Sequence, residues 1–229
     1  MIRALPEVFR TARLLAQRVA ERHLADLERL HADPAVAEWI GDPATSDGLS
    51  EWVTAVVAPH WHMYGYGLFA LYEKHARSSD DAVVGGAVTE AAEAGGAVPE
   101  AAEAGGAVPE AANAGGAGGA AGEAGAARLF VGRAGLVDAG DDVTAAFAEK
   151  RVVELEFAVA PGARGCGYAT EIARALTGLA LTSLDRESVA ALVRPGNAGA
   201  LRVLEKLDFA AAGELDRDGT PLLLLRRRR

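Results

Sequence analysis

Residues 152–170 read VVELEFAVAPGARGCGYAT, and this stretch decides the fold. Its first nine residues are mostly β-branched and other apolar residues, a composition typical of a strand. A Pro-Gly loop follows, and apolar residues then recur at helical spacing over residues 168–184. A strand that passes into a helix through a glycine-rich turn is typical of an α/β chain.

The sequence before this stretch follows the same pattern. Residues 20–32 and 49–61 have the apolar spacing of helices, and residues 67–74 (GLFALYEK) predict a strand. Two segments compete as the neighbour of that strand in a hairpin, residues 81–88 and residues 128–137. We favour residues 128–137, because their apolar side chains are larger.

The sequence after the stretch predicts one more strand and helix, and then a hairpin. The strand covers residues 189–193 and the helix residues 198–206, after a Pro-Gly break. Strands at residues 210–215 and 221–225 flank Asp218-Gly219, a strong turn signal. We therefore predict one α/β (α+β) domain over residues 1–229, with a mixed sheet of about six to seven strands flanked by helices.

A low-complexity repeat interrupts this pattern between residues 85 and 127. It consists of the decapeptides GGAVTEAAEA, GGAVPEAAEA and GGAVPEAANA, followed by Gly and Ala. Paired glycines and prolines interrupt every short helical turn, and such turns are unstable in water. We predict a disordered insertion in a hairpin loop.

The charge balance of the chain is dominated by this insertion. The formal net charge is −9, but without the six acids of residues 85–127 the rest has 26 acids against 23 bases, or −3. A nearly neutral domain argues against a nucleic-acid-binding protein, which needs a basic face. We interpret Arg226 to Arg229 as a solvated tail.

Several further classes are disfavoured by composition. The only cysteine is Cys166, so an intramolecular disulfide and a multi-cysteine zinc site are both excluded, and a reducing cytoplasm is the expected location. Residues 1–22 lack the apolar core of a secretory signal. No apolar run has the length of about 18 residues that a membrane span needs.

The glycine-rich turn predicts an anion site. Backbone N–H groups in such a turn point at a ligand, and the start of the following helix adds partial positive charge. Gly165 and Gly167 allow close approach, and Arg164 can pair with a phosphate. The expected ligand is a pyrophosphate.

The spacing of the turn separates two cofactor classes. A dinucleotide fold needs G-x-G-x-x-G and an acidic residue after the next strand, but Thr170 and Arg194 occupy those positions. Residues 164–169 (RGCGYA) instead match R-x-x-G-x-A. This pattern resembles the acetyl-CoA pyrophosphate loop of the GNAT acyltransferases.

Other segments extend the resemblance in the same order along the chain. Together they are similar to the RimJ/RimL-type branch, the ribosomal-protein N-acetyltransferase-like proteins, over nearly the whole chain except the insertion and residues 138–151. The segments are residues 11–15 (TARLL), 32–41 (ADPAVAEWIG), 64–71 (YGYGLFAL), 131–136 (VGRAGL), 167–171 (GYATE) and 194–209 (RPGNAGALRVLEKLDF).

The resemblance implies a set of residues for acetyl-CoA. Strand residues would bond the pantetheine arm and polarise the thioester, and the loop would hold the pyrophosphate. These residues are Phe157, Ala158 and Val159 for the strand and Arg164, Gly165, Cys166, Gly167, Tyr168, Ala169 and Thr170 for the loop. Asn197 matches a family asparagine that reaches the pantetheine, and it is also a natural helix N-cap; both roles stay open.

The reaction implied is acetyl transfer from acetyl-CoA to a primary amine, which must lose a proton before it attacks. Glu154 and Glu156 alternate onto one face of a strand and are the candidate bases, although solvated acids would give the same pattern. Glu154 matches a glutamate common in the family. Glu156 stands where relatives often have a small residue, which would narrow the acceptor cleft and favour a cationic amine.

The chain departs from the family in three places. Ala200 replaces a frequent serine, and Leu204 stands where other branches have a tyrosine, so no side-chain acid for the leaving sulfur is visible. Asp208 replaces a glycine and is expected to adopt a left-handed cap.

His60 and His62, two residues apart in a helix, would face different directions and are unsuited to share a metal.

The resemblance therefore implies an acetyl-CoA-dependent N-acyltransferase. Its acceptor would be a protein N-terminus, an amino acid or a small amine, with homodimerisation left open and neither nucleic acid nor membrane as a partner. Two alternatives stay open, a CoA-binding protein without catalysis and an interaction protein whose functional part is the repeat.

Overall fold

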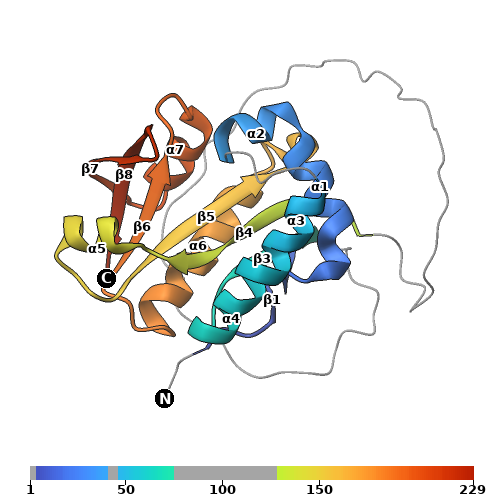
Figure 1. Cartoon of the computed structure of the whole chain (residues 1–229), viewed down its shortest axis with the longest axis horizontal. Helices are drawn as coiled ribbons and strands as arrows, with labels where there is room; N and C mark the ends of the chain where they lie inside the picture. The colour runs from blue at the N-terminus through green and yellow to red at the C-terminus, as the bar shows by residue number, and fades with distance from the viewer. Residues whose placement is uncertain (1–3, 41–45, 75–127) are drawn as a thin grey trace, which may run out of the picture. The chain divides into compact units, whose positions relative to one another are not determined.

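The computed structural model describes residues 4–40, 46–74 and 128–229, and these residues form an eight-stranded sheet in the order β1-β2-β3-β4-β5-β6-β8-β7 (Figure 1). Only β5 and β6 are parallel, and every other neighbouring pair is antiparallel. The strands are β1 (Val8–Arg10), β2 (Leu14–Arg18), β3 (Leu68–Glu73), β4 (Phe130–Asp138), β5 (Val152–Val159), β6 (Ser188–Val193), β7 (Ala210–Arg217) and β8 (Thr220–Arg228).

Seven α-helices and three other short helical segments lie among the described residues. The α-helices are α1 (Leu24–Ala32), α2 (Pro34–Ile40), α3 (Ser46–Trp52), α4 (Ala58–Tyr64), α5 (Asp141–Phe147), α6 (Tyr168–Thr182) and α7 (Ala198–Glu205). A π-helical turn (Val53–Val57) joins α3 to α4, and 3-10 turns occupy Glu21–His23 and Pro161–Ala163. No helix in this part of the chain is long and apolar enough to cross a membrane.

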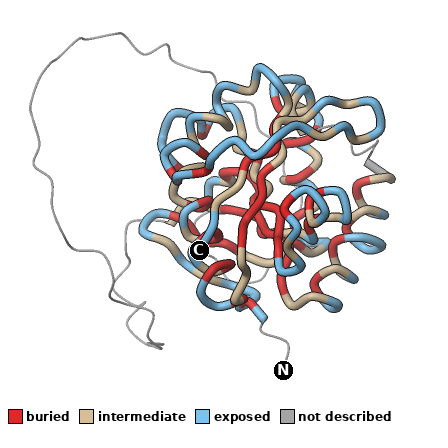
Figure 2. Tube along the Cα trace, turned by 90° about the vertical axis from the view of Figure 1, so that its left-hand side faces the viewer, coloured by how far each residue is buried: buried red, intermediate tan, exposed pale blue. Residues whose placement is uncertain are grey.

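Helices cover the two faces of the sheet. In Figure 1 helices α1, α3 and α4 lie in front of the sheet, and α6 lies behind β4 and β5. The most buried residues run along the central strands (Figure 2). Leu136 and Ile172 are completely buried, and Trp61 packs edge-on against Phe69 with ring centroids 5.1 Å apart. The amphipathic spacing read from the sequence thus corresponds to real buried faces.

The predicted mixed α/β fold is confirmed, with more elements than expected. The sheet has eight strands rather than six to seven, because β1 and β2 form a hairpin whose strands have only three and five residues. Such short strands give too few alternations for a periodic signal. Helices α2 and α5, each of seven residues, were missed for the same reason.

The hairpin partner of β3 is the segment that we favoured. Residues of β3 pair antiparallel with β4, from Leu68 opposite Gly135 to Tyr72 opposite Phe130. The competing segment at 81–88 and the repeat at 85–127 lie outside the described residues. The strand pairing still shows that the repeat belongs to the connection between two adjacent strands.

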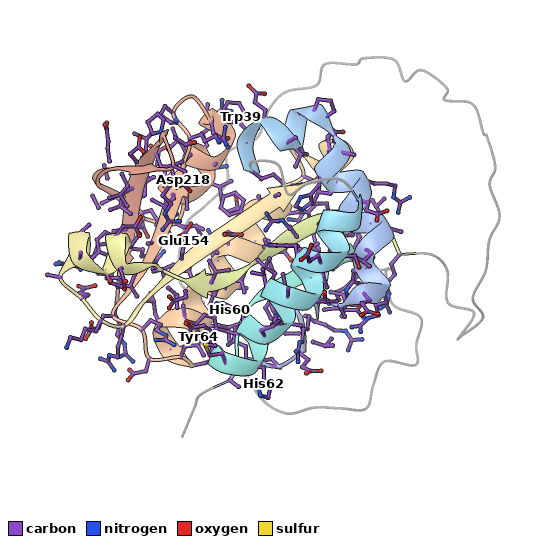
Figure 3. All side chains as sticks on the ribbon, in the orientation of Figure 1. Trp39, His60, His62, Tyr64, Glu154 and Asp218 are labelled. Atoms are coloured by element: carbon purple, nitrogen blue, oxygen red, sulfur yellow. The ribbon has the colours of Figure 1, made fainter. Side chains whose placement is uncertain are left out.

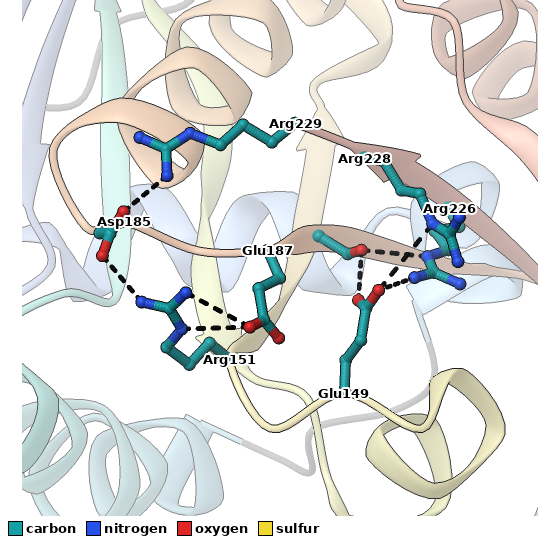
Figure 4. Close-up of polar contacts among 8 residues, drawn as sticks. Glu149, Arg151, Asp185, Glu187, Arg226, Arg228 and Arg229 are labelled. Carbon is teal, nitrogen blue, oxygen red and sulfur yellow. Dashed lines mark hydrogen bonds and ion pairs between the residues drawn. The ribbon is translucent and has the colours of Figure 1, made fainter.

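The interpretation of the C-terminal arginines as a solvated tail was wrong. Arg226 to Arg228 continue β8, which pairs with β6 as far as Ser188 opposite Arg228. Figure 4 shows the acids that neutralise them: Arg226 pairs with Glu149, and Arg229 lies 2.6 Å from the Asp185 carboxylate. The apolar residues end at Leu225, so hydropathy alone placed the end of the strand too early.

One feature of the sheet positions the site. The parallel strands β5 and β6 pair at only three positions, from Val152 opposite Ser188 to Glu154 opposite Ala190. Beyond Glu154 the two strands diverge, although β5 continues to Val159 and β6 to Val193. The divergence opens the sheet at the ends of both strands.

The position of the repeat leads to a prediction about deletion. Replacing residues 85–127 with a short Gly/Ser linker should change the free energy of unfolding by only about 1 kcal/mol, because loop-closure entropy depends weakly on loop length. Chemical denaturation with circular dichroism measures this change. A variant that loses cooperative unfolding would contradict the prediction.

Candidate active site

A cleft of about 850 Å³ occupies the opening between β5 and β6. Its walls come from the diverging strands, the glycine-rich turn with the start of α6, helix α7, helix α2 and the β7–β8 hairpin. The lining includes residues 154–159 of β5, 191–194 at the end of β6, 163–165 and 167–170 of the turn, 196–200, 202–204 and 206 in and beside α7, Val36, Trp39 and Ile40 of α2, Arg133 of β4, and Arg217, Thr220 and Leu222.

Twelve of the thirteen candidate site residues line this cleft. The structure brings together Glu154, Glu156, Phe157, Ala158, Val159, Arg164, Gly165, Gly167, Tyr168, Ala169, Thr170 and Asn197. Cys166 is the exception, since its side chain is exposed and lies outside the lining. The thiol is therefore not in the cleft, although its backbone belongs to the turn.

The turn has the geometry of an anion cradle. Gly165 and Gly167 adopt φ angles of +78° and +79°, a conformation that strains residues with a Cβ. The amide N–H groups of Tyr168, Ala169 and Thr170, in the first turn of α6, have no acceptor within the described residues. These groups are therefore available to an anion at the end of the cleft.

Two arginines brace the turn from either side. Arg164 donates from Nη2 to the Ala35 carbonyl at 2.9 Å, which ties the turn to α2. Arg13 donates from Nη1 to the Cys166 carbonyl at 2.7 Å and from Nε to Glu171 at 2.7 Å. The Arg13 contact could not be predicted from the sequence, because it joins the β1–β2 turn to a residue more than 150 positions away.

Glu154 is a buried carboxylate with one close cationic partner. Its Oε2 accepts a hydrogen bond from Arg217 Nη1 at 3.1 Å, and the residue is only 6% exposed. Burial, and next the negative charge of Glu156, raise the pKa of Glu154 to about 7, while Arg217 opposes this rise. A carboxylate with this pKa can accept a proton near neutral pH.

Glu156 lies on the same strand face and is held by a second arginine. Arg133 Nη1 donates to Glu156 Oε2 at 2.9 Å, and Arg133 Nε donates to His31 Nε2 at 3.2 Å. Burial, followed by the charge of Arg133, lowers the pKa of His31 to about 4, so this histidine is neutral and accepts the bond. The Arg133 guanidinium also lies 5.6 Å from the centre of the Trp52 ring.

Sequence reasoning missed the partners of both glutamates and one wall of the cleft. Arg133 had a visible signal, since it interrupts an apolar strand and therefore points to a partner inside the domain. Arg217 and Trp39 had none, because their neighbours are far away in sequence. Figure 3 shows Trp39 on α2 and Glu154 on β5, both of which line the cleft.

Asn197 at the start of helix α7 has one of the two roles that were predicted for it. The Asn197 side chain accepts a hydrogen bond from the Ala200 amide at 3.0 Å, so the predicted N-cap is confirmed. Its contact with a cofactor stays a prediction. Leu204 of α7 is fully buried, and Asp208 has the expected left-handed backbone, with φ of +58°.

The two histidines of α4 serve the fold or lie at the surface. His60 bonds the Tyr66 carbonyl through Nδ1 and the Asp138 amide through Nε2, at 2.9 and 3.0 Å. His62 is exposed (Figure 3). Among the described residues no group of three or more His, Cys, Asp or Glu side chains could hold a metal.

The cleft is basic although the chain is acidic. Its described lining has six basic side chains, namely Arg133, Arg164, Arg194, Arg202, Lys206 and Arg217, against the two acids Glu154 and Glu156. The whole chain carries a formal charge of −9. A concave site of opposite sign to the rest of the molecule attracts an anionic ligand.

Comparisons with known proteins agree with this geometry. Residues 107–210 match a family model described as an acetyltransferase (GNAT) domain, and no curated protein matches the sequence. An acetyltransferase from Agrobacterium tumefaciens is similar in structure, with 18% identity, a TM-score of 0.62, and coverage of 99% of this chain and 96% of that one. The mixed α/β fold is therefore a GNAT fold.

Two other similar structures contain coenzyme A. One is the aminoglycoside acetyltransferase AAC(6')-Ib in complex with coenzyme A, at 16% identity and a TM-score of 0.59 over 94% of this chain and 95% of that one. The other is spermidine N-acetyltransferase from Vibrio cholerae in complex with CoA and spermine, at 12% identity and a TM-score of 0.58, with the same two coverages. At these identities the likeness concerns the fold.

The raised pKa of Glu154 leads to a prediction about stability. The folded protein binds this proton more tightly than the unfolded chain, so the wild type should lose stability as pH rises from about 4.5 to 7. Glu154→Gln cannot bind this proton, so its stability should not fall in this way. The free energy of unfolding of Glu154→Gln, relative to that of the wild type, should therefore rise by on the order of 1–3 kcal/mol between pH 5 and pH 8.

Urea unfolding at several pH values measures that difference. The matched control is Glu214→Gln, because Glu214 is exposed on β7. Its stability should follow the wild type across the same range. A constant difference between Glu154→Gln and wild type at all pH values would show that burial does not perturb this carboxylate.

Proposed function

We propose that this chain, with its GNAT fold and its match to a GNAT acetyltransferase domain, is an acetyl-CoA-dependent N-acetyltransferase that acts on a primary amine. The observation that carries the proposal is the divergence of β5 and β6 above a glycine-rich helix start, in a basic cleft. The finer assignment to a RimJ/RimL-like type rests on the ordered sequence segments.

The anionic part of acetyl-CoA fits the end of the cleft. Its pyrophosphate would lie on the amides of residues 165–170, and the basic side chains of the lining would balance its phosphate charges. The edge of β5 that faces β6 is unpaired from Leu155 onward and offers N–H and C=O groups to the pantetheine amides. Phe157, Ala158 and Val159 lie on that edge.

Bound acetyl-CoA supplies the thioester that is attacked. A backbone N–H of Phe157, Ala158 or Val159 would donate to the thioester oxygen and stabilise the charge that develops there. Glu154 would take the proton of the acceptor ammonium, so that the nitrogen lone pair forms the new N–C bond while the C–S bond breaks. The sulfur leaves as a thiolate and takes the second proton, which the nitrogen loses as the amide forms. Because a thiol has a pKa of about 8.5, no side-chain acid is required.

The acceptor side of the cleft is suited to an amine that carries one positive charge. Glu154 and Glu156 are the only acids in the described lining, and each is already paired with an arginine. The lining also has an apolar part, which is formed by Val36, Trp39 and Ile40 of α2. We therefore place amino acids, protein N-termini and simple monoamines before polycationic amines in the list of acceptors.

A second candidate is a CoA-binding protein without catalysis. The observation that favours it is that Ala200 and Leu204 have no side-chain group that could donate a proton to the leaving sulfur; Leu204 is also fully buried. The cytoplasmic location and the state of oligomerisation stay predictions.

Two measurements test the proposed function. Calorimetry should detect acetyl-CoA binding to the full chain, and a thiol-release assay should detect turnover with monoamines and short peptides at higher kcat/KM than with spermidine. Glu154→Gln should bind acetyl-CoA like the wild type but lose at least 100-fold in turnover near pH 7.

Each outcome selects between the candidates. Absence of acetyl-CoA binding would contradict both the transferase and the CoA-binding alternative. Binding without turnover on any amine would leave the alternative. Turnover that is unchanged in Glu154→Gln across pH 6 to 9 would keep the reaction but remove Glu154 as its base.

A further inference from the structure

Arg217 joins the last hairpin to the Glu154 carboxylate of β5, 63 positions earlier in the sequence. Arg217, near the end of β7, bonds Glu154 through Nη1 and bonds Asp142 of α5 through Nε and Nη2, at 2.9 and 3.2 Å. The two bonds to Asp142 form a bidentate pair, which fixes the plane of the guanidinium. Arg217 is therefore oriented before it contacts Glu154.

Asp142 is itself fixed. Its Oδ1 accepts a hydrogen bond from the Val143 amide at 2.8 Å in the first turn of α5. Gly140, with φ of +31°, allows this close packing, because a Cβ there would lie 2.8 Å from Asp142 Oδ1 and 3.5 Å from Arg217 Nη2. The local backbone is thus built around the Asp142–Arg217 pair.

We propose that Arg217, oriented by Asp142, is the positioning residue for Glu154: it fixes Oε2 and leaves Oε1 to receive the proton of the acceptor amine. This inference rests on the proposed function. Arg217 lines the cleft, whereas no described residue donates to Glu154 Oε1. The closing β7–β8 hairpin would then contribute to the reaction as well as to the sheet.

The charges around Glu154 show what Arg217 does. Within β5, Glu156 repels a negative charge on Glu154, and the other nearby arginine, Arg133 of β4, is bonded to Glu156. The strand residues opposite Glu154 are Val137 and Ala190, and α2 contributes only apolar side chains to the lining. Among the described residues Arg217 is thus the one cation bonded to this carboxylate.

Removal of the Arg217 charge changes the pKa of Glu154 in a definite direction. Burial and Glu156 raise the pKa of Glu154, and Arg217 lowers it, so loss of Arg217 raises the pKa further. A base with a higher pKa is protonated over more of the neutral range. The acidic limb of the pH–rate profile must then move to higher pH.

The experiment compares Arg217→Met, which keeps the length of the side chain without its charge, with Arg217→Lys and Asp142→Asn. We expect the acidic limb of kcat/KM to move up by at least about one pH unit in Arg217→Met. Asp142→Asn should lower kcat/KM without moving the limb up, because it releases the guanidinium but also removes a negative charge that raises the pKa of Glu154. In Arg217→Lys the acidic limb should lie close to its wild-type position. At pH values above the limb, the rates of Arg217→Met, Arg217→Lys and the wild type should converge. Arg151→Met is the control, since Arg151 pairs with Asp185 and Glu187 outside the cleft lining (Figure 4).

The outcomes separate this inference from the proposed function. Absence of acetyl-CoA turnover in the wild type would contradict the proposed function itself. Wild-type turnover with an unmoved acidic limb in Arg217→Met, or a rate that falls equally at every pH, would overturn the role of Arg217 alone. If Arg217→Met does not fold, Arg217→Gln takes its place, and an unmoved acidic limb in that variant overturns the role of Arg217.

Discussion

The short pairing of β5 with β6 is the constraint on which the site depends. Two parallel strands that share three paired positions leave the remaining backbone of β5 without a neighbour on one side. Unpaired N–H and C=O groups in a concave site need water or a ligand as a partner. The same divergence places the glycine-rich turn at the end of the opening, so one break in the sheet creates both a strand edge and an anion cradle.

The second feature of the site is a buried carboxylate, Glu154, beside a partly exposed one, Glu156. Burial of like charges is costly, and the chain compensates with Arg133 for Glu156 and Arg217 for Glu154. Such pairs contribute little to stability compared with apolar packing. Their presence in the cleft, with one carboxylate perturbed toward neutral pH, supports the proposed role of Glu154 in proton transfer.

Part of this arrangement could be predicted from the sequence and part could not. The strand–turn–helix unit at residues 152–170 was visible, because its glycines, apolar alternation and helical spacing are all local. The contact of Arg217 was not, since Arg217 reaches Glu154 only after β6 and α7 have brought the last hairpin beside the cleft. The end of β8 was misplaced because its arginines are stabilised by acids from other segments, which hydropathy does not register.

The central claim is that the opening between β5 and β6 is built for acetyl-CoA. A crystal structure of the full chain with bound coenzyme A tests it most directly. The account predicts the pantetheine between the two strands, bonded to the backbone of residues 157–159, with the pyrophosphate on the amides of residues 165–170. Coenzyme A bound elsewhere, or a β5–β6 opening closed by additional strand pairing in the crystal, would contradict it.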